Sequence, residues 1–215
     1  MKFKKIFLLL LTLSILEACD VKFDGKKASN GDAENVEIID AASSKHLAFK
    51  GVPIDGTLKQ FTTRMKQAGF IERKRLDGTS VLIGDFAGYK NCMVYVSTID
   101  GNDVVSEIGV VFPDRSTWEN LYGDYKNLKE LLTEKYGQPS MAQEVFLSKP
   151  IVDDDKFRMY AVSDDACKYE SLFTTEKGDI KLSIGHSERE SAFVRLQYND
   201  KINGETVKQQ AINDL

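Results

Sequence analysis

The sequence predicts an α+β fold in which an antiparallel sheet, built from two meanders, carries two main helices packed on it. Apolar residues recur at helical spacing in two segments, and a series of short β-rich segments follows each of them. Asp-Gly and Lys-Gly pairs, which favour tight turns, separate several of these β-rich segments. The order of helix and then strands occurs twice, which is consistent with a degenerate helix-meander repeat.

The first helix is expected to begin after Asp55-Gly56-Thr57, a turn followed by a helix start. Apolar residues then recur at three- and four-residue intervals from Leu58 to Ala68, and Gly69 occupies the usual stop position. Four strands should follow as a meander. Their expected ranges are Phe70–Leu76, Thr79–Phe86, Cys92–Ile99 and Val104–Phe112.

The second helix is the clearest in the chain, from Trp118 to Tyr136. Ser116-Thr117-Trp118-Glu119 has the pattern of a capping box, and Gly137 and Pro139 end the helix. Gly123 inside it costs about 1 kcal/mol relative to Ala, so we expect a neighbour packed closely against it.

A second meander is expected in the last part of the chain, together with a short helix over Asp154–Val162. The expected strands are Glu144–Leu147, Lys168–Thr175, Ile180–Gly185 and Ala192–Tyr198. We interpret residues 45–202 as a single globular domain and residues 203–215 as a polar tail that frays.

Residues 1–18 have the pattern of a signal peptide. Lys2, Lys4 and Lys5 precede an apolar run from Ile6 to Leu16, which is shorter than the roughly 20 residues that a membrane-spanning helix needs. The next residues, Leu16-Glu17-Ala18-Cys19, resemble the lipobox of bacterial lipoproteins, although Glu17 departs from that pattern.

This resemblance implies that Cys19 receives a diacylglycerol thioether and becomes the first residue after cleavage. Acyl chains such as palmitate would then anchor the protein to a membrane of the bacterial cell envelope. Residues 19–44 are expected to be a flexible tether, because their polar composition buries little apolar surface. The body resembles an uncharacterised family of small anchored bacterial α+β proteins, and in architecture resembles secreted modules such as the beta-lactamase inhibitor protein and outer-membrane assembly lipoproteins.

Composition excludes several classes of function. The net charge is −4, with no long basic run beyond the N-terminus, so no nucleic-acid partner is expected. The sequence has no Gly-x-Ser-x-Gly elbow and no glycine-rich phosphate loop, and His46 and His186 are interpreted as solvated loop residues. We therefore expect no catalytic residue and no cofactor.

No metal site is expected either. Asp153-Asp154-Asp155 suits the N-terminus of a short helix, and Asp100-Gly101-Asn102-Asp103 suits a hairpin turn. Cys92 and Cys167 are each expected to open a strand, where they either form a disulfide between the two halves or remain free thiols.

Tyrosines offer the remaining candidates for contact. Tyr89 with Lys90 at a turn, and Tyr122 with Tyr125 on the second helix, either pack in the core or form a recognition surface. The hypothesis that follows is a non-catalytic binding module with a protein, peptide or glycan partner. The alternatives are an inhibitor or immunity lipoprotein against an exported enzyme or toxin, and a hydrolase that uses paired carboxylates.

Overall fold

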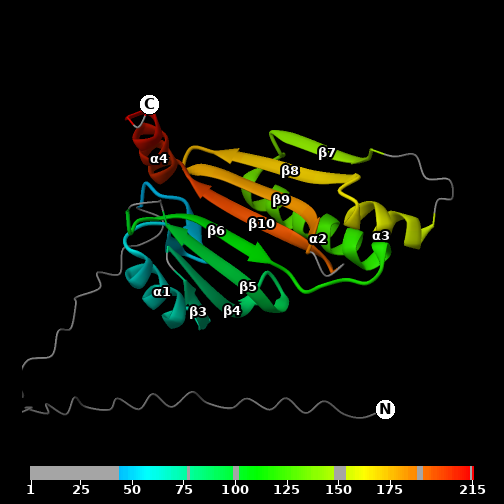
Figure 1. The fold of residues 1–215 in the computed structure, drawn as a ribbon, viewed down its shortest axis with the longest axis horizontal. Helices are drawn as coiled ribbons and strands as arrows, with labels where there is room; N and C mark the ends of the chain where they lie inside the picture. The colour runs from blue at the N-terminus through cyan, green and yellow to red at the C-terminus, as the bar shows by residue number, and fades with distance from the viewer. Residues whose placement is uncertain (1–43, 77, 99–101, 148–153, 188–190, 214) are drawn as a thin grey trace, which may run out of the picture. The chain divides into compact units, whose positions relative to one another are not determined.

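The computed structural model describes residues 44–76, 78–98, 102–147, 154–187, 191–213 and 215 (Figure 1). These residues form a mixed α+β fold, which confirms the predicted fold class. The predicted signal peptide, Cys19 and nearly all of the predicted tether lie outside the described residues.

One eight-stranded antiparallel sheet has the strand order β3-β4-β5-β6-β10-β9-β8-β7 (Figure 1). Each half is a four-stranded meander preceded by a helix, and the halves meet where β6 pairs with β10. The strands are β3 (Ile71–Leu76), β4 (Thr79–Phe86), β5 (Tyr89–Thr98), β6 (Val105–Val111), β7 (Met141–Phe146), β8 (Cys167–Thr175), β9 (Gly178–His186) and β10 (Ala192–Asp200). A small separate ribbon pairs β1 (Ala48–Phe49) with β2 (Val52–Pro53).

One face of the sheet carries the core. The register places five buried residues opposite one another across β4, β5, β6, β10 and β9, namely Leu82, Val94, Val110, Leu196 and Leu182. Side chains alternate between the two faces of a strand, so their neighbours Tyr95, Gln197 and Lys181 lie on the other face and are only partly buried. The core is therefore one layer between the sheet and its helices.

Helix α1 (Leu58–Gln67) covers the first meander. Thr57 caps it, because its side chain accepts a hydrogen bond from the Gln60 N–H while the Gln60 side chain accepts one from the Thr57 N–H. Phe61 and Met65 are fully buried, so the predicted apolar stripe is the one that faces the sheet.

Helix α2 (Trp118–Tyr136) has the predicted bounds and packs on β8, β9 and β10; in Figure 1 it lies behind these strands. Its cap differs from the prediction, since Thr117 rather than Ser116 accepts the hydrogen bond, from the Asn120 N–H. The prediction of a close neighbour at Gly123 is wrong, because a Cβ atom there would meet nothing within 4 Å.

Helix α3 (Asp155–Ser163) lies between β7 and β8 in the chain. Asp154 caps it by accepting from the Phe157 N–H, as the acidic run predicted. Asp155 accepts a hydrogen bond from the Glu119 N–H at 3.2 Å, so its carboxylate also stabilises the N-terminal turn of α2.

Helix α4 (Lys201–Asn213) replaces the fraying tail that we expected from residue 203. Asp200, at the end of β10, accepts a hydrogen bond from the Asn203 N–H at 3.0 Å. The buried Asn203 side chain donates in turn to the Ile54 and Val105 carbonyl oxygens. The predicted tail therefore begins with a capped helix that is bonded into the fold.

Candidate ligand-binding groove

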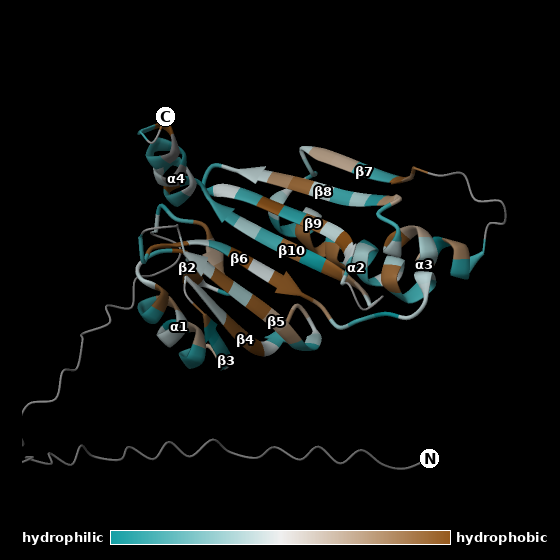
Figure 2. Cartoon of the chain, in the orientation of Figure 1, coloured by the Kyte–Doolittle hydropathy of each residue, from teal (hydrophilic) through white to brown (hydrophobic). Residues whose placement is uncertain are grey.

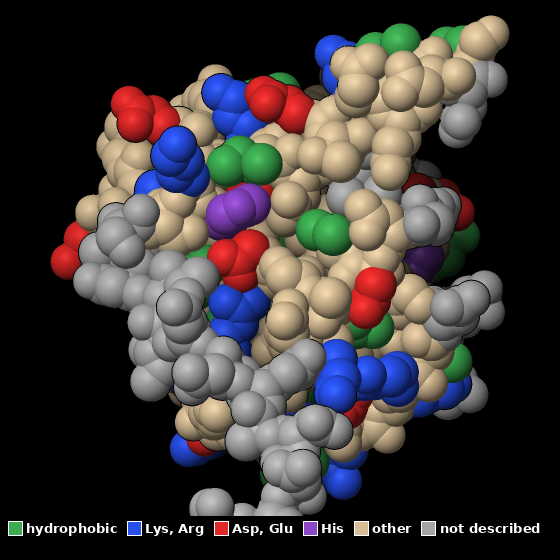
Figure 3. All heavy atoms as spheres, turned by 90° about the vertical axis from the view of Figure 1, so that its left-hand side faces the viewer, with side chains coloured by type: hydrophobic (Ala, Val, Ile, Leu, Met, Phe, Trp, Pro, Cys, Tyr) green, Lys and Arg blue, Asp and Glu red, His purple; other side chains and the backbone are tan. Residues whose placement is uncertain are grey.

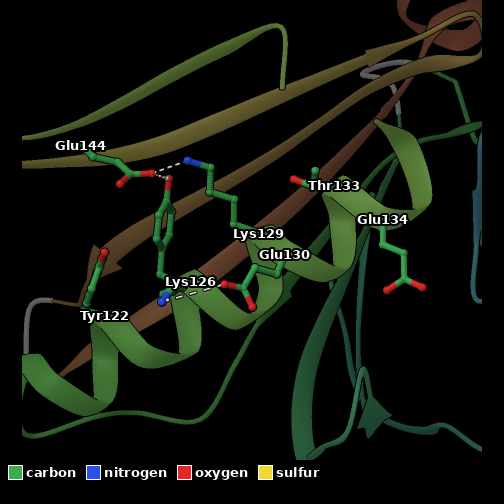
Figure 4. A pocket seen from close by; sticks show the side chains of 8 residues that line it. Tyr122, Lys126, Lys129, Glu130, Thr133, Glu134 and Glu144 are labelled. Carbon is green, nitrogen blue, oxygen red and sulfur yellow. Dashed lines mark hydrogen bonds and ion pairs between the residues drawn. The ribbon is translucent and has the colours of Figure 1, made fainter. Parts of the chain in front are cut away.

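A groove of about 540 Å³ lies between α2 and the sheet edge at β7 (Figure 4). We call it the α2–β7 groove. It is lined by Tyr122, Tyr125, Lys126, Lys129, Glu130, Thr133 and Glu134 of α2, and by Glu144 of β7.

Helical periodicity creates the α2 wall of this groove. Tyr122, Lys126, Lys129 and Thr133 follow one another at four-, three- and four-residue intervals, so they lie along one flank of the helix. The buried stripe of α2, which includes Tyr125, faces the sheet beside this flank. The groove thus runs along the border between the buried stripe of α2 and its solvent-exposed flank.

Tyr125 forms the floor of the groove. Its side chain is fully buried, and its hydroxyl group shares a hydrogen bond of 2.8 Å with the Ser171 hydroxyl group and donates to Glu144 Oε1 at 3.4 Å. Burial raises the pKa of Tyr125 well above its ordinary value. The phenol is therefore a neutral, fixed group that holds β8 and β7 against the helix.

Lys129 and Glu144 form an ion pair across the groove, and Figure 4 shows the two side chains reaching toward each other. Both are partly exposed, with 27% and 31% of their side-chain surface accessible. Lys126 and Glu130 form a second, exposed pair on the helix. Charges of both signs therefore border the groove.

Aromatic rings form one end of the same region. The Trp118 ring stacks on the Tyr122 ring, with centroids 5.7 Å apart, and the Tyr169 ring meets both of them edge-on. Phe146 at the end of β7 packs against Trp118 at 4.9 Å. This cluster fixes Tyr122 in place, so the groove has a rigid aromatic end.

Strand β7 supplies an unusual sheet edge. It is the terminal strand of the sheet beside β8, and five of its six residues are exposed. Met141 and Val145, which are apolar, have 49% and 39% of their surface accessible. The α2–β7 groove and this edge lie side by side.

The two candidate disulfide cysteines are free thiols, Cys92 in β5 and Cys167 in β8. Four strand-to-strand steps separate β5 from β8, which at about 4.8 Å each is roughly 19 Å and far beyond the reach of a disulfide. Burial raises the pKa of Cys92 to about 11 and that of Cys167 to about 12. Both are therefore protonated, packed thiols at neutral pH.

Both histidines are partly buried and hydrogen-bonded, whereas the sequence led us to expect freely solvated loop residues. His46 Nδ1–H donates to the buried Asp200 carboxylate at 2.9 Å. His186, the last residue of β9, contacts Asp165 Oδ1 through Nε2 and the Ser187 carbonyl oxygen through Nδ1, each at 3.2 Å. Asp165 and a backbone oxygen thus lie within hydrogen-bonding distance of the two ring nitrogens of His186.

Within the described ranges, no group of three or more His, Cys, Asp or Glu side chains gathers in a way that could hold a metal ion. Lys, Arg, Asp and Glu side chains are interspersed over the end of the domain seen in Figure 3. Among the helices that the structure describes, none is long and apolar enough to cross a membrane.

The tyrosines singled out in the sequence have separate roles. Tyr125 packs in the core, whereas Tyr122 lines the groove. Tyr89 accepts a hydrogen bond from the Asn127 side chain and packs edge-on against Phe112, while Lys90 pairs with Asp85. Sequence reasoning predicted a strand over Glu144–Leu147, which the structure places at Met141–Phe146. It missed the place of Glu144 in the groove and the edge position of β7, for which the sequence carries no local signal.

Comparison of the chain with protein-family models, curated proteins and solved structures gives no match.

Proposed function

We propose that this protein is a lipid-anchored module of the bacterial cell envelope that binds a partner without catalysis, and that the partner occupies the α2–β7 groove. The anchor is Cys19, by resemblance of residues 16–19 to a lipobox. The observation that carries the proposal is the position of the groove: a preformed, partly aromatic hollow adjoins an exposed sheet edge.

The chemistry of the groove supports binding rather than turnover. Of the three carboxylates that line it, Glu144 is engaged by both Lys129 and the Tyr125 hydroxyl group, and Glu130 forms an ion pair with Lys126. Outside the groove, the pKa values of the Glu72 and Asp85 carboxyl groups are shifted downward. A general acid would instead need a carboxyl group with a raised pKa.

A photo-crosslinking experiment in living cells tests the proposal. A benzophenone amino acid replaces Lys126 or Thr133, which line the groove, and in a matched control replaces Lys59, an exposed residue of α1. We expect one discrete adduct from the two groove positions and none from the control. Absence of an adduct at both groove positions, with normal protein levels, would reject the groove as the binding site.

The anchor has its own test. The Cys19→Ser variant should lose the acyl chains, and the protein should move from the membrane fraction to the soluble fraction. Intact-mass spectrometry of the native protein should find the amino end at a diacylated Cys19. An unmodified amino end would refute the anchor while leaving the groove experiment interpretable.

A further inference from the structure

We propose that the ligand of the α2–β7 groove is an extended peptide segment that pairs with β7 as a ninth strand of the sheet. This inference rests on the proposed function and names the class of partner. Strand addition supplies main-chain hydrogen bonds from the sheet edge, and neighbouring pockets then select the side chains.

The register of β7 shows which backbone groups are available. The Leu147 N–H donates to the Ala166 carbonyl oxygen at 2.8 Å, and the pairing of Val145 with Lys168 continues the same register. Backbone groups alternate in direction along a strand, so those of Met141, Gln143 and Val145 face β8. The N–H and C=O groups of Ala142, Glu144 and Phe146 consequently point to the free edge.

The opposite edge of the sheet makes a useful comparison. Strand β3 carries Arg73, Lys74 and Arg75 in succession, and a register shift between Glu72 and Lys74 interrupts its pairing; it is largely hydrophilic in Figure 2. Charges and bulges are the features by which proteins block an edge against further strands. Strand β7 has no Lys, Arg or Pro, and its one charged side chain, Glu144, is paired with Lys129. Its pairing with β8 runs without a shift from Met141 to Phe146.

The side chains on the two faces of β7 indicate which side chains the peptide should have. A residue opposite Glu144 would share its face and enter the groove beside Lys129. Residues opposite Met141 and Val145 would lie on the other face and cover those two apolar side chains, which are now exposed. The expected ligand is therefore an extended peptide with apolar side chains at every second position.

A second copy of this chain is a less suitable occupant. In a two-fold antiparallel pairing that uses Ala142, Glu144 and Phe146 of both copies, each Glu144 lies directly opposite the other. Like charges at directly opposed positions destabilise a pair of strands. A segment from another protein carries no such restriction.

Peptide selection provides the test. The full-length chain in detergent is used to select from phage-displayed random ten-residue peptides, and the enriched peptide is synthesised with a fluorescent label. The Ala142→Pro variant removes an N–H group that points to the free edge and leaves the pairing with β8 intact. We expect its dissociation constant for the peptide to rise at least tenfold, while the control Ala142→Ser binds like the unmodified chain.

Backbone methylation keeps the test valid if Ala142→Pro does not fold. Two versions of the peptide carry N-methyl groups at alternate residues, in one register or in the other. Only the register that faces β7 should lose binding, by at least tenfold. Strand pairing would be overturned if both versions bound equally well or if no peptide were enriched. It would also be overturned if a folded Ala142→Pro variant bound the peptide like the unmodified chain.

Two further outcomes separate this inference from the proposed function. A dimer in light scattering that Ala142→Pro abolishes would assign the edge to a second copy, and would overturn the peptide. A groove adduct in cells that persists in Ala142→Pro, or that proves to be a glycan, would retain the binding function and reject the strand. Absence of any groove adduct would reject the function itself.

Discussion

At the residue scale, the Asp200 carboxylate connects the beginning and the end of the domain. It is buried, and it accepts hydrogen bonds from the His46 Nδ1–H, the Leu47 N–H and the Asn203 N–H at 2.9, 2.7 and 3.0 Å. A buried carboxylate is costly unless such donors surround it. The Leu47 and Asn203 N–H groups in turn need Asp200, because both are buried away from water.

Replacement of this carboxylate should therefore be strongly destabilising. We expect Asp200→Ala to lower the free energy of unfolding by about 3 kcal/mol, since it leaves buried donors without a partner. Urea unfolding followed by circular dichroism measures the change. The control is Asp114→Ala, an exposed aspartate, and a similar loss in both variants would contradict the role given to Asp200.

Glu72 in β3 predicts a dependence on pH. Its hydrogen bond with Lys66, aided by Arg75 and Ser80 and opposed by partial burial, lowers the pKa of its carboxyl group from 4.5 to about 2. The ionised form is therefore favoured in the folded state. The resulting stabilisation is complete above pH 4.5 and is lost as the pH falls through about 2.

The Glu72→Gln variant should be less stable than the native chain by about 1 kcal/mol at pH 7. This difference should shrink below pH 4.5 and be lost as the pH falls through about 2, because the native carboxyl group becomes protonated over that range. Thermal unfolding at several pH values measures it, with the exposed Glu176→Gln as control. A difference that is independent of pH would assign the effect to packing rather than charge.

At the element scale, a glycine inside a helix and a glycine inside a strand should respond to alanine in opposite directions. Gly123 is exposed on α2 with nothing within 4 Å of a Cβ atom, whereas a Cβ atom at Gly84 in β4 would lie 2.4 Å from the Phe70 ring. Gly123→Ala should stabilise the protein by about 1 kcal/mol through helix propensity. Gly84→Ala should destabilise it, because the added methyl group clashes with the Phe70 ring. Differential scanning calorimetry measures the melting temperature of both variants, and a change in the same direction in both would contradict the prediction.

Elements with a strong local pattern were predictable. The bounds of α2 and the start of α1 follow from apolar periodicity and stop residues. Strand β5 begins at Tyr89 rather than Cys92, because Ala87 and Gly88 form a tight turn with φ of 50° and 85°. An alanine with positive φ is not part of the usual turn signature.

Helix α4 was missed for a different reason. Its residues form no clear apolar stripe, and the bonds that secure it run from Asn203 to Ile54 and Val105. Such contacts are distant in sequence and leave no local signal. The α2–β7 groove was missed in the same way, since the edge position of β7 depends on strand order, which the sequence pattern does not specify.

At the scale of the whole domain, the two helix-meander units share one core. The buried cluster includes Phe61 of α1 and Trp118 of α2, and the pairing of β6 with β10 continues the sheet between the units. At that boundary neither unit has an unpaired strand, because β6 of the first unit pairs with β10 of the second. The units should therefore unfold together rather than one after the other.

Trp118 makes this cooperativity measurable, since it is the single tryptophan of the chain and lies in the second unit. Its fluorescence and the far-UV circular dichroism should show the same urea midpoint. Phe61→Ala in the first unit removes a fully buried ring and should cost about 3–5 kcal/mol. Because the core is continuous, the urea midpoints of the Trp118 fluorescence and of the circular dichroism should shift equally. If only the dichroism midpoint shifted, the two units would unfold independently.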